Sequence, residues 1–300
     1  MKLIYFRGAV SNFGDELNTY LWQRLLPPGF LDDDASELFF GIGSIIGDYP
    51  PEKARKYVVG SGFGGYTKPP KMSAGEWNVV FVRGPRTAEL LGLPPEKAIC
   101  DGAILLRRLA LPAPAGDLGI GYMPHFQSLE RGLWPEACRR AGFRLIDPTA
   151  PVEQILAEIR GLKVLITEAM HGAIVADALR VPWLAVKPIH SQHHWKWLDW
   201  ADSLGIELRQ HALRPSSLME FYVGMVGHRQ YDWGFGSGRV HRLATSRLAL
   251  PVNAAIVDLA ARRLRQIAEA EPQLSSDEAI QRRTEQSEVA VADFVRSRAA

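Results

Sequence analysis

The sequence has few cysteines, no long apolar run and no excess of either charge. Its two cysteines in 300 residues, Cys100 and Cys138, lack a Cys-x-x-Cys spacing, which disfavours a disulfide framework or a zinc site and indicates a reducing, cytoplasmic compartment. A net charge of +2 gives no electrostatic indication of nucleic-acid binding. No stretch reaches the roughly 18 apolar residues of a membrane span, and the first apolar run is too short for a signal peptide. Any contact with a membrane is therefore expected to be peripheral.

The sequence does contain a regular alternation of strand and helix patterns. In the first half we expect strands and helices at 2–6, 16–26, 37–40, 57–59, 78–82, 85–91 and 98–100. In the second half we expect them at 118–123, 133–141, 143–146, 152–160, 163–167, 172–179, 183–186, 194–204 and 206–208. This alternation is typical of an α/β fold with mainly parallel sheets.

The length suits two domains, and a Pro/Ala/Gly segment at 111–116 has the composition of a linker between them. We predict two Rossmann-like domains that face a cleft, over residues 1–112 and 117–250. Residues 251–300 are predicted to form a helical tail, with helices at 251–269 and 277–298. Two arrangements of this tail are open: its last helix crosses back to the first domain, or it is a partly frayed extension.

The most informative residue is His171, between the predicted strand 163–167 and the helix that follows it. The carboxyl end of a parallel strand is where ligands bind in open α/β sheets, and a histidine exchanges protons near neutral pH. Glu168 lies at the same junction and is a second candidate for proton transfer. Gly172 has no side chain to hinder a substrate. The alternative is a core or capping histidine that bonds only backbone groups.

Other candidates in the second half are histidines near strand ends. His125 follows the strand 118–123 and is expected at the same sheet edge as His171, as a binding residue or as an ordinary loop histidine. His190, His193 and His194 form the densest group, with Asp199 nearby, but their spacing has no ligand geometry that we recognise. The tryptophans among them favour a packed amphipathic helix over sugar stacking: Trp195, Trp197 and Trp200. We therefore predict no metal site and no cofactor.

The first half offers an anion site and a proton acceptor. Arg83 and Arg86 flank the start of a helix opened by Pro85, where a guanidinium and the helix dipole both favour an anion, although a surface arginine is an equal alternative for Arg86 and a weaker one for Arg83. Asn12 and Asp15 precede the first helix, where they either cap it or face the cleft to bind sugar hydroxyls or accept a proton.

A glycine-rich loop with the spacing G-x-G-x-x-x-G spans 41–47. It follows the second strand, and no acidic residue follows the next strand to bind a ribose, which argues against a dinucleotide site. We expect Gly43 and its neighbours to bring backbone N–H groups close to a phosphate or another substrate.

These segments resemble the polysaccharide pyruvyl transferases, and most of all the succinoglycan-type exopolysaccharide ketal transferases. The motifs occur in the same order as in that family over residues 1–210: NFGDELN at 12–18, GIGS at 41–44, VRGPR at 82–86, CDGA at 100–103 and TEAMHGA at 167–173. The resemblance implies a fold like that of GT-B glycosyltransferases and phosphoenolpyruvate as donor. It implies that the acceptor is a sugar of an exopolysaccharide repeat unit, lipid-linked at the cytoplasmic membrane face. In the family a histidine in the last motif is the proposed general acid, which maps onto His171, and an arginine that contacts the donor maps onto Arg83.

One position departs from the family pattern. Many members have arginine two residues before the histidine, where this chain has Ala169. The resemblance then requires another partner for the donor, and we consider Arg86, Arg7, Lys187 and the helix N-terminus. Two other functions are open: a GT-B-type glycosyltransferase that uses a nucleotide sugar, and a non-catalytic sugar-binding protein of polysaccharide assembly.

Overall fold

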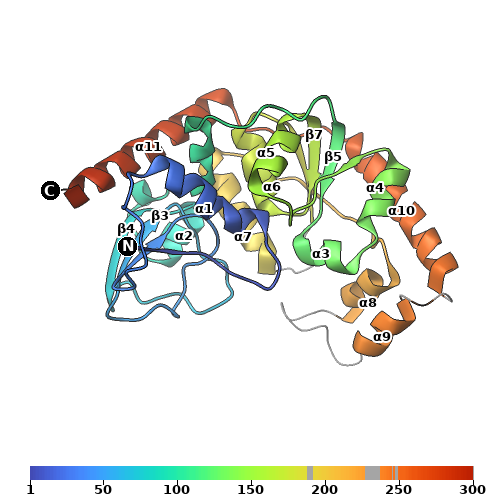
Figure 1. The fold of residues 1–300 in the computed structure, drawn as a ribbon, viewed down its shortest axis with the longest axis horizontal. Helices are drawn as coiled ribbons and strands as arrows, with labels where there is room; N and C mark the ends of the chain where they lie inside the picture. Colours follow the sequence, from blue (N-terminus) through green and yellow to red (C-terminus); the bar gives the residue numbers. More distant parts are fainter. Residues whose placement is uncertain (188–191, 227–236, 245, 247–248, 300) are drawn as a thin grey trace.

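A computed structural model of the chain describes residues 1–187, 192–226, 237–244, 246 and 249–299. In the described residues the strands form two sheets in which all neighbours are parallel, which confirms the predicted α/β class (Figure 1). The first sheet has its strands in chain order: β1 Lys2–Ile4, β2 Glu37–Phe40, β3 Arg55–Val59 and β4 Glu76–Phe81.

The second sheet has the order β6-β5-β7-β8-β9. Its strands are β5 Gly119–Met123, β6 Arg144–Leu145, β7 Leu162–Thr167, β8 Trp183–Val186 and β9 Gln210–His211. After β5 the chain moves to one side of the sheet, and after β7 it moves to the other. Ligands bind doubly wound sheets outside the carboxyl ends of the two strands where this direction reverses. A ligand site is therefore expected at the residues that follow β5 and β7.

Helices connect and cover the strands. They are α1 Phe13–Leu25, α2 Pro85–Leu90, α3 Phe126–Arg131, α4 Trp134–Ala141, α5 Val152–Arg160, α6 Met170–Ala178, α7 Gln192–Leu204, α8 Leu218–Val226, α9 Ser237–Ala244, α10 Leu250–Ala268 and α11 Asp277–Ala299, with 3-10 segments η1 Pro95–Lys97 and η2 Gly102–Arg108. Most expected elements are present, and α5, β2 and β8 have the predicted bounds. No helix of the described residues is long and apolar enough to cross a membrane. Both cysteines are free and buried.

Two expected strands are wrong. At 98–100 only Ala98 forms a bridge, to Val82, because Asp101 then starts η2 by accepting a hydrogen bond from the N–H of Ala103. The segment 206–208 does not pair, and β9 begins later, at Gln210. Between this segment and β9, the side-chain amide of Gln273 bonds both the N–H and the C=O of Arg209. The backbone groups of Arg209 are therefore satisfied without pairing to a strand.

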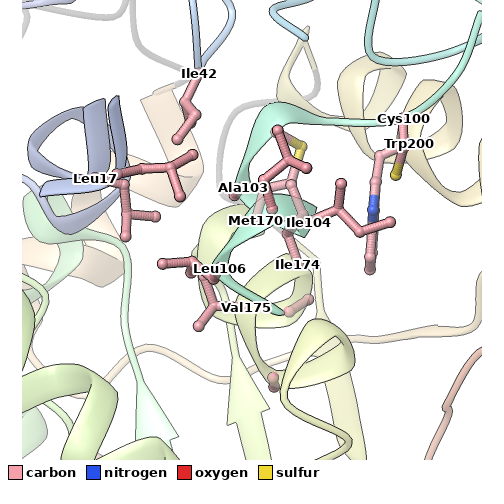
Figure 2. Packing of buried hydrophobic residues seen from close by; sticks show 14 of the residues in the cluster. Leu17, Ile42, Cys100, Ala103, Ile104, Leu106, Met170, Ile174, Val175 and Trp200 are labelled. Carbon is pink, nitrogen blue, oxygen red and sulfur yellow. The ribbon is translucent and has the colours of Figure 1, made fainter. Parts of the chain in front are cut away.

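One continuous core joins the elements of the two sheets. Figure 2 shows buried side chains of α1, η2, α6 and α7 packed together. The labelled residues are Leu17, Ile42, Cys100, Ala103, Ile104, Leu106, Met170, Ile174, Val175 and Trp200. The segment 111–116 connects η2 to β5. The GT-B-like arrangement and the domain boundaries stay predictions.

The last helix, α11, crosses back to the first sheet, which was one of the two open arrangements (Figure 1). The ring of Phe294 lies 5.2 Å from that of Tyr57, 5.7 Å from that of Phe30 and 6.4 Å from that of Phe39. Arg298 donates a hydrogen bond to the hydroxyl of Tyr57. The helix therefore ties the C-terminal region to the sheet built from the start of the chain.

Candidate functional site

A cavity of about 460 Å³ lies where segments from both sheets meet. This size is typical of a site for a small molecule. It is lined by Ile4, Tyr5, Phe6, Arg7, Asn12, Asp15, Gly43, Ser44, Ile45, Ile46, Tyr49, Tyr66, Thr67, His125, Phe126, Gln127, His171 and Lys196. Six of the residues singled out in the sequence thus share one cavity: Arg7, Asn12, Asp15, Gly43, His125 and His171.

The start of α1 supplies a buried carboxylate. The N-cap is Asn12, not Asp15: the Oδ1 atom of Asn12 accepts from the N–H of Gly14. Its Nδ2 atom donates to Oδ2 of Asp15 at 2.7 Å. Burial raises the pKa of Asp15 to about 6, against the opposing charges of His171 and Lys196. A carboxyl group that titrates there is suited to accept a proton near neutral pH.

The glycine loop after β2 forms another wall. The side chain of Asn18 holds it by a pair of hydrogen bonds, accepting from the N–H of Ile42 at 2.7 Å and donating to its C=O at 3.0 Å. Gly43 has φ +116°, a conformation that favours glycine, and its Cα faces the carboxylate of Asp15. The loop therefore lines the cavity with backbone, as the glycine pattern predicts.

His171 lies in the first turn of α6, between α1 and η2. A Cβ atom on Gly14 would overlap Nδ1 of His171 and lie 2.7 Å from its Cγ, so the Nδ1 edge of the imidazole packs directly on the backbone of α1. On the other side, Nε2 lies 3.7 Å from Oδ2 of Asp101. The side chain of His171 is 13% exposed and that of Asp101 is fully buried. Sequence reasoning missed Asp101 as a site residue; its signals were a carboxylate at the end of an expected strand and its place in the CDGA motif at 100–103.

Two flexible cations also line the cavity. Lys196, on α7, donates a hydrogen bond from Nζ to the hydroxyl of Tyr66 at 2.9 Å. Arg7, in the loop after β1, lies over the ring of Tyr5. Sequence reasoning missed Lys196 because the tryptophans around it indicated a packed helix. Those tryptophans do pack: Trp197 and Trp200 are buried, while Lys196 projects from the other face.

The other cations expected at the site lie elsewhere. Arg83 is fully buried behind the cavity wall, where it pairs with Asp199 and donates to the hydroxyl of Ser44 and the C=O of Phe63. It reaches the cavity only through Ser44. Arg86 pairs with Asp202 at the surface, and Lys187 is exposed after β8. Direct contact of these three with a donor stays a prediction.

Comparison with known proteins shows the family to which the chain belongs. The family model described as polysaccharide pyruvyl transferase matches residues 12–190, a range that contains Asp15, Asp101 and His171. The chain belongs to this family. It is also 35% identical to the succinoglycan biosynthesis protein ExoV of Rhizobium meliloti (strain 1021), over 95% of this chain and 96% of that protein. The chain is thus related to a transferase family over more than half its length and to one relative over nearly all of it.

Two further residues that the sequence indicated lie behind the cavity of this transferase. Glu168 is buried, and its carboxylate accepts from the N–H of His125 and the hydroxyl of Ser128. It thereby fixes α3 beside β7 and does not line the cavity. Gly172 faces the strands: a Cβ atom there would lie 2.6 Å from Oγ1 of Thr167. Its small size serves the packing of α6 on the sheet.

The histidine-rich segment of the transferase contains no metal site among the described residues. His194 shares a hydrogen bond with Gln210, and Asp199 accepts from Arg83 and Thr87. His190 and the side chain of His193 lie outside the described residues.

Proposed function

We propose that the protein transfers pyruvate from phosphoenolpyruvate to a sugar of an exopolysaccharide repeat unit and closes it into a cyclic ketal. The observation that supports this most is the meeting of His171 and Asp15 in one cavity, within the range that matches the family. A histidine and a carboxyl group with a raised pKa are an acid and a base suited to neutral pH. A lipid-linked acceptor would bring the protein to the cytoplasmic face of the membrane.

The donor needs cations, because phosphoenolpyruvate carries a carboxylate and a phosphate. We propose that Lys196, with Arg7, takes the place of the arginine that many family members have at the position of Ala169. Both line the cavity, and the positive charge of Lys196 also lowers the pKa of Asp15 in part against the effect of burial. The backbone and hydroxyl groups of the loop at Gly43 and Ser44 add hydrogen-bond partners.

In the first stage, His171 donates a proton to the methylene carbon of the donor. This produces an oxocarbenium-like centre at the adjacent carbon, and a sugar hydroxyl attacks it. Asp15, as carboxylate, accepts the proton of that hydroxyl. Acid–base assistance of this kind contributes about 10²–10⁴ in rate.

In the second stage, the bond from the same carbon to the phosphate oxygen breaks and a second hydroxyl of the sugar closes the ketal. The two hydroxyl protons balance the reaction: one replaces the proton that His171 gave to the new methyl group, and the other leaves with phosphate. The products are the ketal and inorganic phosphate. Glu168 has no part in these steps in our proposal, since both its oxygens accept hydrogen bonds beneath the cavity.

The decisive experiment is incubation with phosphoenolpyruvate and lipid-linked oligosaccharides, followed by phosphate measurement and mass analysis. We expect phosphate release that depends on the acceptor, a carboxyethylidene group on the sugar, and loss of both in His171→Gln. Release of nucleotide from a nucleotide sugar, without consumption of phosphoenolpyruvate, would instead identify a glycosyltransferase. Ligand binding without turnover would identify a sugar-binding protein.

A further inference from the structure

Two buried polar atoms face each other behind the cavity. Oδ2 of Asp101 and Nε2 of His171 lie 3.7 Å apart, and neither has a hydrogen-bond partner among the described residues. A buried carboxylate oxygen without a partner is costly, and buried polar atoms in folded proteins are nearly always bonded. Two such atoms directed at each other indicate a contact that forms at some stage of the working cycle.

The surrounding structure holds both groups in place. The other oxygen of Asp101, Oδ1, accepts from the N–H of Ala103 at 3.0 Å, which fixes the carboxylate at the start of η2. Packing of η2 on α6 keeps this carboxylate beside the first turn of α6. On the other side of the ring, Nδ1 of His171 lies against the Cα of Gly14, which limits the movement of the imidazole. The ring therefore has little freedom except along the line to Asp101.

We propose that Asp101 is a positioning residue, which accepts a hydrogen bond from the Nε2–H of His171 and leaves Nδ1, beside the Cα of Gly14, as the unprotonated nitrogen of the neutral ring. The separation of 3.7 Å exceeds a hydrogen bond, but such bonds in ligand-free enzymes commonly tighten when the substrate binds. This role rests on the proposed function, in which His171 is the acid. It extends that function by naming the group that sets its tautomer.

The chemistry follows from the charge of Asp101. A carboxylate that accepts from one ring nitrogen fixes the proton there, orients the ring and stabilises the imidazolium that must form before each proton transfer. Other ionisable groups line the cavity in front of the imidazole. They are Asp15 of α1, Lys196 of α7, His125 at the start of α3 and Arg7 of the loop after β1. Among the described residues, only Asp101 lies within ion-pair distance of the ring.

The wild-type protein provides the first test. We expect the neutral imidazole of His171, observed by ¹⁵N NMR after histidine labelling and assigned by its loss in His171→Gln, to be protonated on Nε2. Protonation on Nδ1, or an equal mixture of both tautomers, would overturn the proposal. This measurement needs no donor and no acceptor, so a wrong choice of donor in the proposed function leaves it intact.

The variant Asp101→Asn provides the second test, because it keeps the shape of the side chain and removes its charge. We expect a mixed tautomer at His171 and a loss in kcat of at least about 10-fold, with the KM for phosphoenolpyruvate unchanged. The matched control is Asp177→Asn, at a carboxylate that is equally buried but bonded by Trp183 and Ser275. The control should keep the wild-type tautomer. If Asp101→Asn behaves in the same way as this control, Asp101 is only structural; if it does not fold, the wild-type tautomer decides.

Discussion

The imidazole of His171 packs directly on the backbone of Gly14, where a Cβ atom would lie within 2.7 Å of the ring. The two residues are far apart in the sequence and belong to α6 and α1, which serve different sheets. Their contact explains why glycine stands in the first turn of a helix, where alanine is the better helix former. It also makes the position of the histidine sensitive to a single methyl group.

Gly14→Ala should therefore displace the ring and reduce kcat by about 100-fold, because a misplacement of about 1 Å is sufficient for such a loss. Steady-state kinetics with the donor and acceptor measures the effect. The matched control is Gly224→Ala in α8, where a Cβ atom meets nothing within 4 Å. It should leave kcat unchanged and add about 0.5–1 kcal/mol to the free energy of unfolding. Full activity of Gly14→Ala would contradict a fixed His171.

Asp15→Asn should raise the stability of the protein at neutral pH. Because burial raises the pKa of Asp15 from 3.8 to about 6, the folded protein retains a proton that the unfolded chain releases between these values. The free energy of unfolding therefore falls by up to about 3 kcal/mol as the pH rises through that window. The asparagine variant has no carboxyl group at this position and does not show this fall. Urea unfolding at pH 3.5 and pH 7.5 tests this prediction. An equal difference between variant and wild type at both pH values would refute it.

Lys196→Met should weaken donor binding. It removes one charge and keeps the aliphatic stem, and a charge-assisted hydrogen bond of about 1.5–3 kcal/mol corresponds to a rise of about 10- to 150-fold in the Kd for phosphoenolpyruvate. Calorimetric titration in the His171→Gln background measures binding without turnover. Lys163→Met is the control, since Lys163 is exposed on β7 beside Asp117. Equal affinities in the two variants would exclude Lys196 from the donor site.

Arg83→Ala should destabilise the fold much more than Arg86→Ala, although both arginines pair with aspartates of α7. The Arg83–Asp199 pair is fully buried, so that removing one partner costs about 3–5 kcal/mol. The Arg86–Asp202 pair is more than one-third exposed and is worth less than about 1 kcal/mol. Urea unfolding of both variants compares them directly. Similar losses would show that Arg83 is not the anchor between α2 and α7.

The helical and strand patterns of the sequence were sufficient to locate most elements. The apolar run that ends at Thr167 forms the expected strand β7, and α5 and β8 have the predicted bounds. The errors lie at the short apolar segments 98–100 and 206–208. Asp101 caps η2 directly after the first, and Gln273 bonds the backbone of Arg209 directly after the second. The cap by Asp101 is a local contact, whereas Gln273 lies 64 residues from Arg209, a pairing that no local pattern reveals.

The sequence by itself determined that His171 follows a parallel strand, since periodicity and chain order fix that position. Only the tertiary structure decided which residues surround it: Asp15 and Gly14 on one side, Asp101 on the other and Lys196 across the cavity. It also placed Arg83 behind the wall of the cavity and Glu168 beneath α3. The physical reason is distance along the chain, because hydrogen bonds, burial and charge act between groups that folding brings within a few ångströms, and a local pattern carries no information about those pairs.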